Sequence, residues 1–97
     1  MKASPSEHEI VARVTICNER GLHARAAAKF VRCAGQYSSQ IWVLREDMNV
    51  AGTSLMGLLM LGAGRGAEIE IRANGQDAQK ALDALVHLVM CRFDETT

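Results

Sequence analysis

The sequence of 97 residues has a single proline, few aromatic side chains and no excess of charge of either sign. Aromatic residues make up 4% of the chain, which leaves little surface for stacking nucleic-acid bases. The 11 lysine and arginine residues balance 11 aspartate and glutamate residues, so the whole molecule attracts nucleic acid or an anionic membrane only weakly. We therefore expect no nucleic-acid partner, and any anion site must be local.

The sequence also has few cysteines and only short apolar runs. Cys17, Cys33 and Cys91 are odd in number and form no CxxC pattern, so the sequence predicts neither a disulfide framework nor a zinc ribbon. Apolar runs such as residues 58–61 are far shorter than the roughly 20 residues that cross a bilayer. Residues 1–9 lack the apolar core of an export signal. We expect free thiols, no membrane insertion and a cytoplasmic location.

What is present is an ordinary globular composition. Hydrophobic residues make up 48% of the chain and charged residues 23%, which is typical of one compact domain at this length. The expected organisation is a flexible N-terminal tail over residues 1–8, a single domain over 9–93 and a C-terminal tail over 94–97. A monomer is expected.

Two hydrophobic periods divide the chain into elements. Alternation with period two predicts half-buried strands, and the helical period predicts amphipathic helices. The expected elements are a strand at 9–16, a helix at about 23–35, strands at 40–44 and 48–51, a short helix at 53–61, a strand at 67–73 and a helix at about 76–92. The first and last strands bury one face only, so this βαββαβα order predicts an α+β fold with helices on one side of an antiparallel sheet. Trp42 is expected in the core.

The segment 21–25, Gly-Leu-His-Ala-Arg, places an imidazole at the start of a predicted helix. The unpaired N–H groups and the dipole of a helix amino terminus hold phosphate oxygens well. Arg25 adds a planar fork of donors for the same anion. The positive helix end also favours a neutral ring at His23, which is nucleophilic. The simpler alternative is that His23 is only a polar residue at a helix start.

A local basic patch adds to this signal. Arg20, Arg25, Lys29 and Arg32 fall between positions 20 and 32, where the sequence has no acidic residue. Because Arg25 and Lys29 are like charges one helical turn apart, they weaken the helix slightly, so stability does not explain the cluster. The patch is either a docking surface or an ordinary solvated helix face.

The predicted short helix at 53–61 is apolar all round, and so short an element cannot bury every side. Leucine and methionine side chains left exposed there suit an adaptable docking surface, although most of them could equally be core. Ser54 fits a capping hydroxyl of this helix. A phosphate on Ser54 would suit the helix but disrupt an apolar docking patch nearby.

Two other patterns predict no site. Residues 62–67 match GxGxxA, but a nucleotide fingerprint needs a strand before it and a helix after it, and here the predicted order is reversed. His87 and Cys91 lie four residues apart on one helical face, and two ligands alone do not define a metal site.

Together, the segments 21–25 and 54–57 resemble the phosphorylation site and the regulatory-serine segment of the phosphocarrier protein HPr family of the bacterial phosphoenolpyruvate-dependent phosphotransferase system. The resemblance covers about residues 10–93, including the element order. It implies an open-faced β-sandwich, in which a four-stranded antiparallel sheet carries three helices on one face.

The resemblance implies a phosphoryl carrier and not a turnover enzyme, with no cofactor or metal. Enzyme I would pass a phosphoryl group to Nδ1 of His23, and an EIIA-type domain of a sugar-uptake or nitrogen-regulatory branch would receive it. Arg25 would stabilise the phosphoryl group, and Ser54 would be a target of an HPr kinase/phosphorylase. The implied partner-binding residues are Arg20, Lys29, Arg32, Leu55, Met56 and Leu59.

Two departures from the family pattern and two alternatives stand beside this hypothesis. Ala26 occupies a position where the family commonly has proline, so the first helical turn loses a fixed φ. Thr53 stands where a basic residue is frequent, which bears on recognition of Ser54 by a kinase. The alternatives are a small phosphohydrolase that binds substrate phosphate through Arg25, and a pure interaction module built on the segment 53–61.

Overall fold

The computed structural model describes residues 9–97, so the expected N-terminal tail over residues 1–8 lies outside the described residues. The elements in chain order are β1 (Glu9–Thr15), α1 (Ala24–Ala34), β2 (Gln40–Arg45), β3 (Met48–Ala51), α2 (Leu55–Met60), β4 (Glu68–Asn74), α3 (Ala78–Met90) and a short 3₁₀ turn, η1 (Arg92–Asp94). None of the helices within these residues is long and apolar enough to span a membrane.

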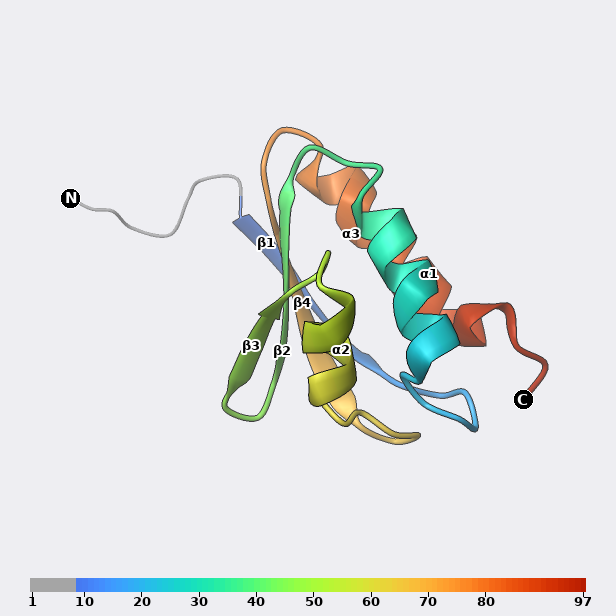
Figure 1. Cartoon of the computed structure of the whole chain (residues 1–97). Helices are drawn as coiled ribbons and strands as arrows, with labels where there is room; N and C mark the ends of the chain where they lie inside the picture. The colour runs from blue at the N-terminus through green and yellow to red at the C-terminus, as the bar shows by residue number, and fades with distance from the viewer. Residues whose placement is uncertain (1–8) are drawn as a thin grey trace.

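The strands form one sheet in the order β1-β4-β2-β3, and every neighbouring pair is antiparallel. The helices α1, α2 and α3 cover one face of this sheet and leave the other face open (Figure 1). The α+β class, the βαββαβα order and the open-faced sandwich are therefore confirmed.

Strand β4 shows how the sequence pattern produces these two faces. Ile69, Ile71 and Ala73 are buried under the helices, whereas the alternate residues Glu68 and Glu70 lie on the open face. The period-two alternation of a strand places successive side chains on opposite faces. Each fully buried isoleucine or phenylalanine stabilises the fold by about 1.5–3 kcal/mol. The single core therefore lies between the sheet and the helices.

The expectation that Trp42 lies in the core is wrong. Its neighbours Ile41 and Val43 are buried, and Trp42 itself is 37% exposed. Because β2 alternates strictly, burying residues 41 and 43 under the helices forces residue 42 onto the open face. No helix covers that face within residues 9–97, so the indole remains in contact with solvent.

The C-terminal helix ends earlier than predicted, at Met90 and not at residue 92. Arg92, Phe93 and Asp94 all have positive φ, at 59°, 54° and 65°. Each non-glycine residue in this conformation costs roughly 1–2 kcal/mol, and the full burial of Phe93 offsets part of this cost. The left-handed turn redirects the chain, and the C-terminal segment returns to the start of α1 (Figure 1).

Candidate functional site

His23 is the N-cap residue of α1, with φ −78° and ψ −179°. Its Nδ1 accepts the backbone N–H of Arg25 at 3.3 Å, and its backbone carbonyl accepts the N–H of Ala27 at 2.8 Å. The side chain therefore satisfies one of the donors that every helix start leaves unpaired. The imidazole lies at the helix start, where the sequence predicted it.

The loop before His23 rests directly on another backbone segment. Gly21 has φ 68°, and a Cβ atom at this position would lie 2.7 Å from Cα of Gly64 and 2.8 Å from the carbonyl oxygen of Ala63. The N–H of Leu22 donates to that same carbonyl at 2.9 Å. Only glycine combines this φ with so close an approach, and the contact fixes the position of the loop that carries His23.

The other ring nitrogen of His23 is paired with a residue that the sequence pattern did not indicate. Nε2 of His23 contacts Oε2 of Glu95, and the side chains are only 16% and 18% exposed. The second carboxylate oxygen, Oε1, accepts the Nδ2 donor of Asn18 at 2.9 Å. The bond from Asn18 lowers the pKa of Glu95, and the hydrogen bond and charge of His23 lower it further.

These two contacts define the tautomer of a neutral His23 ring. A carboxylate is an acceptor only, so the nitrogen that faces Glu95 is the protonated one. Nδ1 accepts a backbone N–H, so it carries the lone pair. In this tautomer the available lone pair is therefore on Nδ1, which lies at the positive end of α1.

Asn18 supports this arrangement from the core side. It is fully buried, and its Nδ2 also donates to the carbonyl oxygen of Gly21 at 2.8 Å. Asn18 thus ties the loop before His23 to the carboxylate of Glu95. Its Oδ1 is the one buried side-chain oxygen or nitrogen without a hydrogen-bond partner among residues 9–97.

Three of the four predicted basic residues gather beside this group. Arg20, Arg25 and Lys29 line a hollow of about 360 Å³ together with the C-terminal segment 94–97. Arg20 and Arg25 are exposed, whereas Nζ of Lys29 donates to the carbonyl oxygen of Phe93 at 2.7 Å. Arg32 is exposed and lines a separate neighbouring hollow. Lys29 therefore contributes positive charge to the hollow and also holds the C-terminal segment in place.

The short helix α2 presents part of its apolar surface to solvent. Ser54 is its N-cap, and its Oγ accepts the N–H of Gly57 at 3.0 Å. Leu55, Met56 and Met60 are 43%, 68% and 65% exposed, whereas Leu59 packs against the core. Met60 was not among the predicted partner-binding residues, although its i, i+4 spacing from Met56 could have indicated the shared face.

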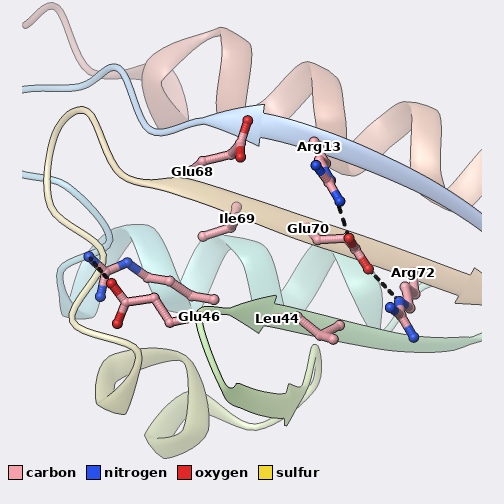
Figure 2. Close-up of a pocket in the computed structure, with 8 residues that line it drawn as sticks. Arg13, Leu44, Glu46, Glu68, Ile69, Glu70 and Arg72 are labelled. Carbon is pink, nitrogen blue, oxygen red and sulfur yellow. Dashed lines mark hydrogen bonds and ion pairs between the residues drawn. The ribbon is translucent and has the colours of Figure 1, made fainter.

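A second hollow, of about 350 Å³, lies on the open face of the sheet (Figure 2). Within it, Nε of Arg13 donates to Oε1 of Glu70 at 3.3 Å, and Nε of Arg72 donates to Oε2 at 2.5 Å. The bond from Arg72 is the main cause of the lowered pKa of Glu70. No histidine or cysteine lines this hollow. Glu70 thus pairs with Arg13 across the two strands and with Arg72 along its own strand, and these pairs neutralise charge on a solvated sheet face.

His87 and Cys91 lie at the exposed end of α3, with Nε2 and Sγ 3.3 Å apart. Within residues 9–97, no three histidine, cysteine, aspartate or glutamate side chains come close enough to share a metal ion. The pair is therefore a surface contact without a third ligand.

Comparison with known proteins identifies the family of the chain. Residues 10–90 match the family model described as the PTS HPr component phosphorylation site. The chain is 48% identical over 83 residues to the phosphocarrier protein HPr of Pseudomonas aeruginosa, covering 84% of this chain and 92% of that protein.

Two further relatives extend the comparison. The chain is 44% identical over 85 residues to the phosphocarrier protein NPr of Shewanella violacea, covering 88% of this chain and 93% of that one. The crystal structure of HPr-C-His from Thermoanaerobacter tengcongensis superimposes with a TM-score of 0.87 at 40% identity, covering 91% of this chain and 99% of that one. The chain therefore belongs to the HPr family of phosphocarrier proteins of the phosphotransferase system.

Proposed function

We propose that the protein accepts a phosphoryl group on Nδ1 of His23 from phosphorylated enzyme I and donates it to an EIIA-type acceptor. The observation that carries this proposal is the position of Nδ1. This nitrogen bears the lone pair, lies at the amino end of α1 and has Arg25 beside it. Membership of the HPr phosphocarrier family supports the same role.

The transfer step needs positioning and charge neutralisation more than covalent assistance, because the transition state of phosphoryl transfer is loose. The lone pair of Nδ1 forms a bond to phosphorus while the bond between phosphorus and the donor breaks, and that electron pair returns to the donor. Nδ1 then stops accepting the N–H of Arg25, which becomes free to donate to a phosphoryl oxygen. The guanidinium of Arg25 neutralises part of the remaining charge.

The exposure of the site suits a carrier. Arg25 is exposed, so its guanidinium remains accessible to a partner. Holding the group too tightly in the ground state would oppose the next transfer. A few donors that can exchange with those of a partner therefore serve both steps of a relay.

A transfer assay tests the proposal. We expect incubation with phosphoenolpyruvate and enzyme I to label the chain with an acid-labile phosphoryl group, and addition of an EIIA-type domain to remove the label. Both sugar-branch and nitrogen-branch acceptors belong in the assay, since relatives are named both HPr and NPr. Steady release of phosphate from acyl or aryl phosphates without any partner would instead support the phosphohydrolase alternative.

Ser54 and the exposed side of α2 form the proposed docking and regulatory element. Leu55, Met56 and Met60 offer an adaptable apolar surface, and Ser54 begins the same helix. A phosphate on Ser54 would interact well with the helix start but would place a desolvated charge against an apolar partner. Phosphorylation here would therefore weaken docking without unfolding the chain.

We expect Ser54→Asp to slow phosphoryl acceptance from enzyme I by about tenfold to a hundredfold, because a carboxylate at the rim of the apolar surface loses solvation on docking. Initial rates at limiting enzyme I measure the effect. Ser54→Ala is the matched control: it removes the cap at a cost of about 1 kcal/mol of stability and should keep the wild-type rate. Equal rates for the aspartate and wild-type chains would exclude a regulatory role for this position.

A further inference from the structure

We propose that Glu95 is a positioning residue for His23, holding the proton on Nε2 and stabilising the positive charge that the ring gains as Nδ1 bonds to phosphorus. This inference deepens the proposed function and rests on it. It assigns a role to the C-terminal segment, which was expected to be a tail.

The carboxylate of Glu95 is engaged on both oxygens. Oε2 contacts Nε2 of His23, and Oε1 accepts the Nδ2 donor of Asn18. Asn18 is fully buried, and the side chains of His23 and Glu95 are more than four-fifths buried. A pair of long, solvated side chains would gain little from such a contact. Here the buried amide of Asn18 fixes the orientation of the carboxylate, so little further side-chain entropy is lost when Glu95 contacts the ring.

The backbone of the segment is held at three points around Glu95. Phe93 is fully buried, and its carbonyl oxygen accepts from Nζ of Lys29 at 2.7 Å. The N–H of Glu95 donates to the carbonyl oxygen of Arg92 at 2.9 Å, and the carbonyl oxygen of Thr97 accepts the N–H of Glu19 at 2.6 Å. These contacts hold the left-handed turn that brings Glu95 to the ring.

The chemistry explains why a carboxylate is useful at Nε2. When the lone pair of Nδ1 bonds to phosphorus, the ring becomes a phosphoimidazolium that still carries its Nε2 proton. The charge of Glu95 stabilises this cation, as a buried carboxylate stabilises the imidazolium of a catalytic triad. On donation the bond between Nδ1 and phosphorus breaks, its electron pair returns to Nδ1, and the ring leaves as a neutral imidazole. No proton needs to leave Nε2 in either direction.

Two substitutions separate the orienting effect from the charge. Glu95→Gln keeps a carbonyl oxygen that can accept the Nε2 proton but removes the charge, whereas Glu95→Ala removes both. We expect acceptance from enzyme I to slow about tenfold in the alanine variant and less in the glutamine variant, given the usual strength of a charge-assisted, partly exposed bond. Glu68→Gln, an equal charge change at an exposed residue on the open face of the sheet, is the control.

The tautomer of His23 distinguishes a positioning role from a purely structural one. Its population should change only if Glu95 holds the proton on Nε2. In ¹⁵N-labelled protein, long-range ¹H–¹⁵N correlations of the neutral His23 ring should show the Nε2–H form in the wild type and in Glu95→Gln. Glu95→Ala should show a measurable share of the Nδ1–H form. Unchanged tautomer populations in Glu95→Ala, or wild-type transfer rates in both variants, would overturn the inference.

Failure of this inference and failure of the proposed function give different results. If both Glu95 variants accept the phosphoryl group at the wild-type rate while His23→Ala accepts none, the positioning role is wrong and the phosphocarrier function stands. If the wild-type chain itself is not labelled, the proposed function fails first. Slower transfer in the Glu95 variants, with the expected tautomer shift and an unchanged Glu68→Gln control, would support both.

Discussion

Replacing His23 by alanine is expected to reduce phosphoryl labelling by enzyme I to the background of the assay. The alanine chain loses the imidazole at the N-cap of α1, and with it the Nδ1 lone pair that would accept the phosphoryl group. Measurement of acid-labile label per chain after incubation with phosphoenolpyruvate and enzyme I gives the result directly.

His87→Ala is the matched control for this experiment, because His87 is an exposed histidine on α3 whose ring has Cys91 as its only side-chain hydrogen-bond partner among the described residues. It should accept the label at the wild-type rate. Continued labelling of His23→Ala, or loss of label in His87→Ala with His23 intact, would place the phosphoryl group on a different residue and end the proposal.

The second large effect concerns stability. Phe93→Ala is expected to lower the free energy of unfolding by about 3–5 kcal/mol, the usual cost of removing a fully buried phenylalanine ring. Phe93 is 0% exposed and belongs to the core, although it lies beyond the end of α3. Denaturation in urea, followed by far-ultraviolet circular dichroism, measures this change.

Met90→Ala controls for side-chain truncation in the same region, because Met90 is the last residue of α3 and is 61% exposed. Its effect should stay within about 0.5 kcal/mol. If Phe93→Ala were equally mild, burial of Phe93 would not anchor the segment 92–97, and this ring would not be what holds Glu95 beside His23.

The strands and α1 follow from local pattern because each has one buried face. Alternation placed β1 within one residue of its observed end, and the same alternation in β4 separates Ile69 and Ile71 from Glu68 and Glu70. Residue type predicts a buried Trp42, but the register of β2 decides its face and leaves it exposed. Only the arrangement of the layers shows that the sheet has an uncovered face.

The end of α3 could not be predicted from pattern. Phe93 continues the apolar spacing of the helix, so the period suggested a helix up to residue 92. Tertiary burial of the ring instead holds Arg92, Phe93 and Asp94 in a left-handed conformation. Three non-glycine residues in that conformation are too rare to expect from their identity.

The site likewise has a part that local sequence predicts and a part that only the fold reveals. His23 and Arg25 lie two residues apart at a helix start, so their relation was visible in the sequence. Glu95 lies 72 residues beyond His23 and reaches it only through the left-handed turn. The sequence around His23 shows the helix end, whereas the carboxylate comes from a distant segment that only the fold brings to the ring.

The open face of the sheet has a practical consequence for biophysical work. Trp42 is the only tryptophan in the chain, and its indole is already in contact with solvent in the folded state. Its emission maximum should therefore shift little when the chain unfolds, which makes intrinsic fluorescence a weak reporter of folding. The same indole is well placed to report, by quenching or a blue shift, any molecule that comes to cover the bare side of the sheet.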